Sequence, residues 1–264
     1  MYTESIAITH HGRTVHGVFR APEGNGPFPA VLMSHGYNGC MTDFDATAAC
    51  LAEGGVASVS YTFCGGSTRD TSGFPSTRMT LFTEREDALA LLDWLKEHPL
   101  IDARRVFLFG GSMGGLVSVL AAAERPRDVA GLALLFPALC VADNWRERFP
   151  RVEDIPETTD FWGLTLGRDF FTSMRDLDVF ALLPALAQPT VIFQGDQDPI
   201  VPLADSQRAE KLFPNARLHV FPGEGHGFSP AAGGQVDALL RNFVKANSPS
   251  KNGGPTAPPD SEIG

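Results

Sequence analysis

The sequence contains no long apolar run. No stretch approaches the ~18 consecutive apolar residues of a membrane-spanning helix, and the first 30 residues mix charges and histidines with short apolar stretches. They therefore lack the apolar segment of a secretory signal. We expect a cytoplasmic protein with no membrane partner.

Cysteines are few, and clusters of basic residues are lacking. Cys40, Cys50, Cys64 and Cys140 show no CxxC spacing, so we expect reduced thiols, with a Cys40–Cys64 bridge as the alternative. The 21 lysines and arginines are scattered among 31 aspartates and glutamates. This distribution argues against a nucleic-acid partner, which requires a basic patch.

Sequence motifs for metals and organic cofactors are also missing. The chain has no HExxH, CxxC, Walker A or dinucleotide-binding pattern. The sequence therefore predicts chemistry carried out by protein groups alone, without a metal and without a cofactor.

What the chain does contain is a series of near-continuous apolar runs. They are AVLM (30–33), VASVS (56–60), VFLFG (106–110), GLALLF (131–136), TVIFQ (190–194) and RLHVF (217–221). Strands this apolar must be covered on both faces, which is typical of a parallel sheet. Before them, SIAIT and VHGVFR alternate in polarity and predict an antiparallel pair.

Segments with helical spacing lie between the apolar runs. They are residues 45–53, 83–98, 116–124, 203–213 and 235–245. The alternation of strands and helices predicts an α/β fold with an open, doubly wound sheet. We expect one domain over residues 1–246.

Two stretches interrupt this alternation. Residues 138–180 are too long for a simple connection and are rich in aromatic residues, which predicts a lid insertion at the carboxyl edge of the sheet. The alternative is that these aromatics only pack the insertion onto the body. Residues 247–264 are rich in proline, glycine and serine and predict a disordered tail.

The hexapeptide GGSMGG (110–115) follows one of the apolar runs. It matches the nucleophile-elbow pattern, in which a serine projects from a strained strand-to-helix turn and its neighbours must be small. Glycines on both sides of Ser112 provide that room. The motif indicates that Ser112 is a nucleophile, rather than a small residue in a plain turn.

A serine nucleophile needs a base and an acid that orients the base, and both follow the serine at later strand ends. GDQDPIVP follows the run that ends at residue 194, and GEGHGF follows the run that ends at residue 221. His226 is the candidate base, ahead of His219, which lies inside a strand. Asp198 is preferred as the acid over Asp196, which we expect to cap the turn as an Asx side chain.

Two backbone N–H groups are predicted to complete the site. A helix that begins at Met113 directs its N-terminus toward the reacting centre, where free N–H groups favour a developing oxyanion. The loop SHGYNG (34–39) is positioned to add the N–H of Tyr37. The alternative for this loop is a plain glycine turn.

In this order, SHGYNG, GGSMGG, GDQDPIVP and GEGHGF resemble the α/β-hydrolase family. The segments LAEGGVASVSYTFCG, TLFTEREDALALLDWLKEH and GLTLGRDFF are similar to those of bacterial feruloyl or cinnamoyl esterases, and the resemblance covers residues 15–245. Two features depart from the family pattern. Gly-Gly-Ser stands where Gly-His-Ser is commoner, and FCGGSTRDTSG (63–73) only partly matches the family's glycine loop.

The resemblance implies a mostly parallel eight-stranded sheet with helices on both faces and a small lid. It implies a catalytic triad of Ser112, Asp198 and His226, with Tyr37 and Met113 as oxyanion-hole donors. The substrate-binding candidates are His35, Phe161 and Trp162. The implied activity is serine-dependent hydrolysis of hydroxycinnamate esters, with a small-molecule ester as the partner.

Three other functions stay open at this point. A short-chain carboxylesterase would use the same residues, as would a prolyl-oligopeptidase-type peptidase, although such a peptidase usually carries a further large domain. A non-catalytic binding protein on the same fold is the alternative from another class. The sequence also leaves open whether the chain forms a homodimer.

Overall fold

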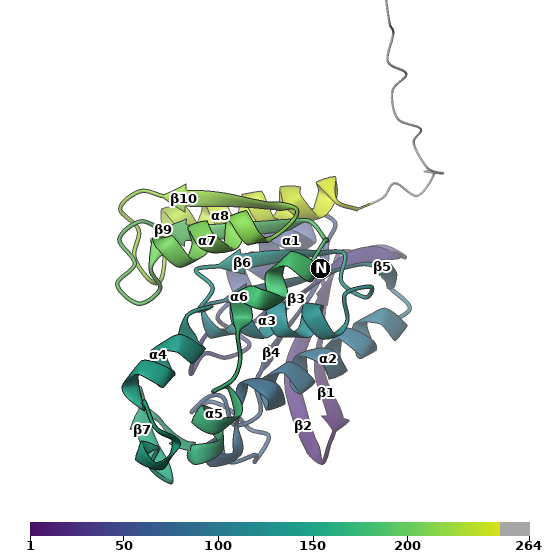
Figure 1. Cartoon of the computed structure of the whole chain (residues 1–264). Coiled ribbons are helices and arrows are strands. Elements are labelled where there is room, and N and C mark those ends of the chain that lie inside the picture. Colours follow the sequence, from purple (N-terminus) through teal and green to yellow (C-terminus); the bar gives the residue numbers. More distant parts are fainter. Residues whose placement is uncertain (249–264) are drawn as a thin grey trace, which may run out of the picture.

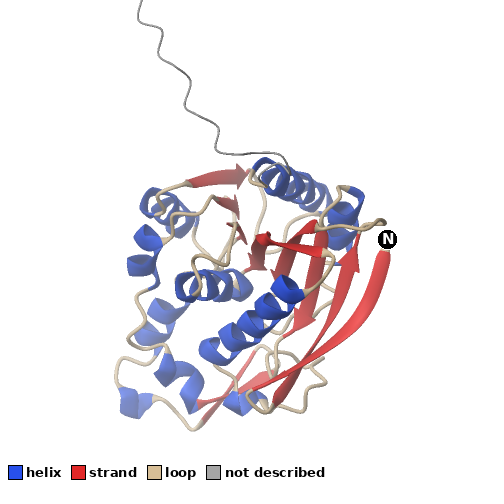
Figure 2. Cartoon of the chain, turned by 90° about the vertical axis from the view of Figure 1, so that its right-hand side faces the viewer, coloured by secondary structure: helices blue, strands red, loops and turns tan. Residues whose placement is uncertain are grey.

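The computed structural model describes residues 1–248, which form one eight-stranded sheet and the helices around it. The order of the strands across the sheet is β1-β2-β4-β3-β5-β6-β9-β10, and Figure 2 shows them in red as one twisted sheet. β2 runs antiparallel to β1 and β4, and the other neighbours are parallel. The predicted fold class is confirmed.

Five of the six apolar runs became the central strands of this sheet, whereas residues 217–221 became β10 at the sheet edge, with only Phe221 buried, so the expectation that this run is covered on both faces is wrong. Every residue of β4 and β9 is buried, whereas β1 at the sheet edge is mostly exposed. The strands of the sheet are β1 (Tyr2–His10), β2 (Arg13–Ala21), β3 (Phe28–Ser34), β4 (Ala57–Thr62), β5 (Ile101–Gly111), β6 (Gly131–Leu135), β9 (Thr190–Gly195) and β10 (Ala216–Phe221).

Helices cover both faces of the sheet. They are α1 (Asp45–Glu53), α2 (Leu81–Glu97), α3 (Met113–Glu124), α7 (Leu203–Leu212) and α8 (Pro230–Ala246). One apolar cluster contains Leu51 of α1 and Leu240 of α8, and a second contains Leu91 of α2 and Leu116 of α3. Figure 1 shows these two pairs of helices on opposite sides of the sheet.

The last helix begins earlier than the apolar spacing predicted. α8 starts at Pro230 instead of residue 235, because Ser229 caps it by accepting a hydrogen bond from the Ala232 N–H. A capping serine followed by proline at the first helical position is a common way to begin a helix. The predicted tail begins at residue 247, and its residues 249–264 lie outside the described residues.

Residues 136–189 form an insertion between β6 and β9. Its elements are α4 (Val141–Arg148), a hairpin of β7 (Thr158–Phe161) and β8 (Leu164–Gly167), α5 (Arg168–Ser173), α6 (Val179–Leu182) and the 3-10 turns Val152–Asp154 and Leu183–Ala185. Of these, α4, β7 and α5 lie at the lower left of Figure 1. A further 3-10 turn, Ser76–Arg78, precedes α2.

Two further findings concern the cysteines and the helices. All four cysteines lie within residues 1–248 and carry free thiols, so the alternative of a Cys40–Cys64 bridge is wrong. Within the same residues, no helix combines the length and apolarity needed to cross a membrane.

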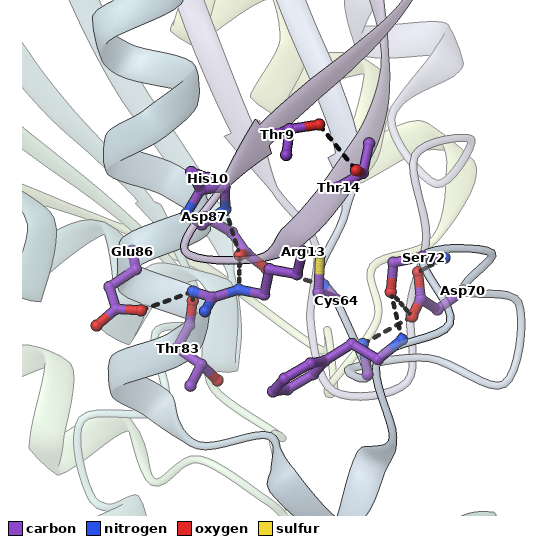
Figure 3. Close-up of polar contacts among 12 residues, drawn as sticks. Thr9, His10, Arg13, Thr14, Cys64, Asp70, Ser72, Thr83, Glu86 and Asp87 are labelled. Atoms are coloured by element: carbon purple, nitrogen blue, oxygen red, sulfur yellow. Dashed lines mark hydrogen bonds and ion pairs between the residues drawn. The ribbon is translucent and has the colours of Figure 1, made fainter.

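A buried ion cluster ties the β1–β2 turn to α2 (Figure 3). Arg13 Nε donates to Asp87 Oδ1 at 2.7 Å, and another of its nitrogens donates to Glu86 at 2.7 Å. His10 Nε2 lies 2.9 Å from the same Asp87 oxygen, and the Cys64 N–H donates to the other one at 2.8 Å. Since the Asp87 side chain is fully buried, its negative charge depends on these donors.

Replacing Arg13 by methionine removes the guanidinium and leaves the Asp87 carboxylate buried. We expect Arg13→Met to lower the free energy of unfolding in urea by about 3 kcal/mol. The control is Arg104→Met, since the Arg104 side chain is 82% exposed in its ion pair with Asp102, and it is expected to change stability by less than about 0.5 kcal/mol. Equal stability of the two variants would contradict this account of the cluster.

Candidate active site

Ser112 lies in a strained turn between β5 and α3. Its backbone φ is +52° and ψ is −119°, a conformation that non-glycine residues rarely adopt. A Cβ atom on Gly110 would overlap the carbonyl oxygen of Gly114, and one on Gly114 would overlap the carbonyl oxygen of Ser34. These two glycines are therefore required by close backbone contacts around the serine.

Three side chains from separate strand ends form a hydrogen-bonded chain. His226 Nε2 lies 3.0 Å from Ser112 Oγ, and His226 Nδ1 lies 2.8 Å from Asp198 Oδ2. Because β5, β9 and β10 run parallel, their carboxyl ends meet at one edge of the sheet and bring these residues together. With Nδ1–H donating to the carboxylate, the Nε2 lone pair accepts from the serine hydroxyl.

Asp198 is held as a carboxylate by several donors. The N–H groups of Ile200 and Val201 donate to its Oδ1 at 2.8 and 2.9 Å, and Gln194 Nε2 donates to its Oδ2 at 3.1 Å. Burial by itself would raise the pKa of Asp198, but the bonds from Val201, His226 and Ile200 hold it below its usual value.

Asp196 does not cap its own turn, so that expectation is wrong. Its Oδ1 accepts instead from the Gly223 N–H at 2.7 Å and thereby joins the loop after β9 to the loop that carries His226. The local turn is closed by Asp198 itself, through Ile200 and Val201. His219 lies in β10, where its ring stacks on Phe193 at 5.7 Å and takes no part in the chain of hydrogen bonds.

The two N–H groups expected to bind an oxyanion lie beside the serine. Within residues 1–248, neither the Tyr37 N–H nor the Met113 N–H donates to another protein group. Met113 is the first residue of α3, so its N–H lies at the positive end of that helix. A Cβ on Gly36 would lie 3.3 Å from Ser112 Cβ, so the loop before Tyr37 approaches the serine closely.

His35 does not reach the substrate side of the site, and its expected contact with substrate is corrected. Its ring is fully buried, with Nδ1 2.7 Å from the Gly36 carbonyl oxygen and Nε2 accepting from the Phe63 N–H at 3.0 Å. Burial lowers the pKa of His35 to about 4, so the ring stays neutral. His35 supports the loop from behind.

A pocket of about 290 Å³ opens beside Ser112 and Met113. Aromatic residues of the insertion form much of its wall, and these are Trp145, Phe161, Trp162 and Phe170. Phe161 and Trp162 stack on each other at 4.6 Å, and Trp162 is 60% exposed at the pocket rim. The insertion therefore lies over the serine, and its aromatics face the pocket as well as the body.

The hairpin of the insertion is bound to the loop that follows β3. The Tyr37 hydroxyl donates to the Phe161 carbonyl at 2.7 Å, and Asn38 Nδ2 donates to the Trp162 carbonyl at 3.1 Å. Burial raises the pKa of Tyr37, so its hydroxyl stays protonated and able to donate. Tyr37, whose N–H is expected to bind an oxyanion, thus also anchors the pocket wall.

Sequence reasoning missed several residues of the site. Gln194 holds Asp198, and its own Oε1 accepts from Ser206 at 2.8 Å. A signal existed, because Gln194 is the polar end of an otherwise apolar strand. Trp145, Asn144 and Arg148 line the pocket from α4, whose eight residues gave no helical signal strong enough to detect.

The chain matches a model of the prolyl oligopeptidase family over residues 43–249. Ser112, Asp198 and His226 all lie within this segment. The loop that carries Tyr37 precedes it, so the match and the loop geometry are separate observations.

Curated relatives share shorter or weaker similarity. The non-heme haloperoxidase of Rhodococcus erythropolis is 39% identical over 79 residues, which are 30% of this chain and 26% of that protein. The human serine hydrolase BPHL is 24% identical over 185 residues, 62% of each chain. The chain spans 26–40% of the length of the curated relatives that it matches first.

Among solved structures, Est1E from Butyrivibrio proteoclasticus with ferulic acid bound superposes over nearly the whole chain. The TM-score is 0.79 at 25% identity, and the match covers 91% of this chain and 96% of Est1E. The chain therefore shares its overall fold with that protein.

The close contacts around Ser112 predict that two neighbouring glycines differ in their tolerance of a side chain. Gly114→Ala forces a Cβ into the Ser34 carbonyl, and we expect it to lower the free energy of unfolding by about 2 kcal/mol. Gly111→Ala is the matched control, because its Cβ would meet nothing nearer than 3.5 Å. Thermal melts measure the difference, and a Gly114→Ala protein as stable as Gly111→Ala would contradict the packing argument.

Proposed function

Because the chain belongs to the prolyl oligopeptidase family of α/β-hydrolases, we propose that it cleaves carboxylic esters through an acyl-enzyme on Ser112. The observation that carries the proposal is the Ser112–His226–Asp198 chain of hydrogen bonds at the base of an aromatic pocket. We further propose hydroxycinnamate esters as the substrate class.

In the acylation step, Ser112 Oγ attacks the ester carbonyl carbon while its proton passes to His226 Nε2. The carbonyl oxygen becomes an oxyanion and accepts hydrogen bonds from the Tyr37 and Met113 N–H groups. Asp198 keeps the imidazole oriented and stabilises its positive charge. The bond to the alkoxy group then breaks, and His226 returns the proton to the leaving alcohol.

Deacylation repeats this sequence with water. His226 Nε2 takes a proton from water as the oxygen attacks the acyl carbonyl, and the tetrahedral intermediate is held by the same two N–H groups. Collapse of the intermediate returns the proton to Ser112 Oγ and releases the carboxylic acid. Each step needs only protein groups, ester and water.

The pocket supports an aromatic acyl group. Trp145, Phe161 and Phe170 give it flat apolar walls, and a ring between them gains both burial and edge-to-face contacts. The superposition with Est1E, whose structure holds ferulic acid, supports the same substrate class.

A peptidase activity is the second candidate, and the family match is the observation that favours it. An amide with a proline before the scissile bond would meet the same serine and histidine. We rank it second because the aromatic walls of the pocket favour a planar conjugated acyl group over a proline ring.

The test is hydrolysis of methyl ferulate, p-nitrophenyl butyrate and a prolyl p-nitroanilide by the purified chain. We expect the highest kcat/KM with methyl ferulate. Activity on the butyrate alone would indicate a short-chain carboxylesterase, and cleavage of the anilide alone would indicate a peptidase. Silence on all three would favour a non-catalytic binding protein.

Removing the serine hydroxyl is expected to abolish turnover without unfolding the chain. We expect Ser112→Ala to lower kcat at least ~10³-fold, because triad members act as a unit. Its melting temperature should match or exceed that of the wild type, since the substitution leaves the turn backbone in place. Undiminished turnover in a folded variant would contradict the proposed nucleophile.

The two neighbouring aspartates provide a matched pair. Asp198→Asn leaves His226 in the wrong tautomer and is expected to lower kcat about 10³- to 10⁴-fold. Asp196→Asn keeps its bond to Gly223 and is expected to stay within about threefold of wild-type kcat, since it does not touch the imidazole. If the two variants lose activity equally, the assignment of the acid is wrong.

A further inference from the structure

One stripe of α4 faces the pocket. Val141, Asn144, Trp145 and Arg148 all line it and follow the i, i+3, i+4, i+7 spacing of a single helix face. The first turn of α4 starts beside Ala138, whose N–H donates to the Ser112 carbonyl at 3.0 Å. The stripe therefore leads from the reacting serine outward, apolar at its start and polar at its end.

Arg148 is the one charged side chain in the pocket wall. The described lining contains no aspartate and no glutamate, and within residues 1–248 the Arg148 guanidinium forms no ion pair and no hydrogen bond. It lies over two aromatic rings instead, 5.6 Å from the centre of Trp145 and 5.8 Å from that of Phe149. This stacking holds the side chain at the pocket without using its N–H donors.

Asn144 lies one turn before Arg148 on the same face. Its amide nitrogen contacts Cys140 Sγ at 3.5 Å, which directs the amide, and its Oδ1 accepts no hydrogen bond from the described residues. The two side chains thus offer adjacent donors and an acceptor at the outer end of an otherwise apolar pocket.

We propose that Arg148 and Asn144 form a subsite for an oxygen substituent at the far end of the acyl group. Arg148 donates to a phenolic oxygen or to a carboxylate, and Asn144 Oδ1 accepts the proton of a phenol. The inference rests on the proposed ester hydrolysis and deepens it, because it names the chemical feature that selects the acyl group.

Geometry and electrostatics favour this subsite. Arg148 lies seven residues after Val141, roughly 10 Å along the helix axis, so only an extended acyl group reaches it from Ser112. Arg148 and Asn144 are both exposed, so they would meet the acyl group at the mouth of the pocket, where water partly screens the attraction between a guanidinium and an anion. Since the planar guanidinium binds carboxylates through two parallel hydrogen bonds, an anionic substituent is expected to gain more than a phenol.

A role without a ligand is the competing explanation. Arg148 ends α4, where a positive charge interacts favourably with the helix dipole whether or not a substrate is bound. In that case, removing Arg148 lowers the stability of the fold or lowers kcat/KM equally for all esters. It does not change the preference between acyl groups. The readout that separates the two explanations is therefore the ratio of the kcat/KM values for two esters that differ in the acyl group.

The experiment compares methyl cinnamate, methyl 4-hydroxycinnamate and methyl 4-carboxycinnamate on the wild type, Arg148→Met, Arg148→Lys and Arg127→Met. We expect Arg148→Met to lower kcat/KM for the carboxy ester about threefold to tenfold and for methyl cinnamate less than about twofold, because Arg148 is exposed. Arg148→Lys should keep part of the preference, because it retains the charge but not the bidentate geometry. Arg127 is exposed, forms no ion pair within residues 1–248 and lies outside the pocket, so Arg127→Met should change none of the three values.

A second readout separates this inference from the proposed activity. The free acids cinnamate and 4-carboxycinnamate are titrated calorimetrically into Ser112→Ala with and without Arg148→Met. The subsite is supported if Ser112→Ala binds 4-carboxycinnamate more tightly than cinnamate and if adding Arg148→Met removes this difference. This result would support the subsite even if no ester is turned over. Equal losses for all three esters, or equal binding of the two acids by both proteins, would overturn the inference while leaving ester hydrolysis intact.

Discussion

The site depends on one steric constraint, the close approach of three backbone segments around Ser112. The end of β3, the end of β5 and the first turn of α3 come so near one another that Gly110 and Gly114 leave no room for a Cβ atom. This packing holds Ser112 at a φ of +52°, which the serine would not adopt in an open turn. The strained backbone directs Oγ toward His226 and leaves the Met113 N–H free.

The same approach links the catalytic edge of the sheet to the pocket. The loop after β3 contributes the Tyr37 N–H beside the serine, and the Tyr37 hydroxyl donates to the Phe161 carbonyl in the insertion. A displacement of the pocket wall would therefore move the loop that is expected to bind the oxyanion. Under the proposed function, this contact would couple binding of the acyl group to the geometry of the reaction, since both would depend on Tyr37.

Local patterns predicted the sheet for physical reasons, and they indicated triad candidates that the structure brings together. β9 is buried on both faces and was visible as an apolar run, and a serine in a strained turn requires glycines that a sequence displays. The insertion was different, because the four-residue strands β7 and β8 are too short for a periodic signal. Their position depends on tertiary contacts of Tyr37 and Asn38.

The direction in which individual side chains point was also not predictable from the sequence. His35 was a substrate-binding candidate, yet its ring is fully buried and accepts a hydrogen bond from the Phe63 N–H. The hydrogen bond from Gln194 to Asp198 joins the two sides of a turn, and no rule of sequence spacing predicts such a bond. The α/β-hydrolase resemblance was confirmed by the comparisons, whereas the roles of individual side chains remain a proposal that rests on geometry.

The most direct test of that proposal is covalent labelling of the wild type by a fluorophosphonate, followed by peptide mapping and parallel assays of ester hydrolysis. The account predicts one phosphonyl group per chain, located on Ser112, with hydrolysis lost in proportion to labelling. A fully active chain that carries no label on Ser112 would contradict it.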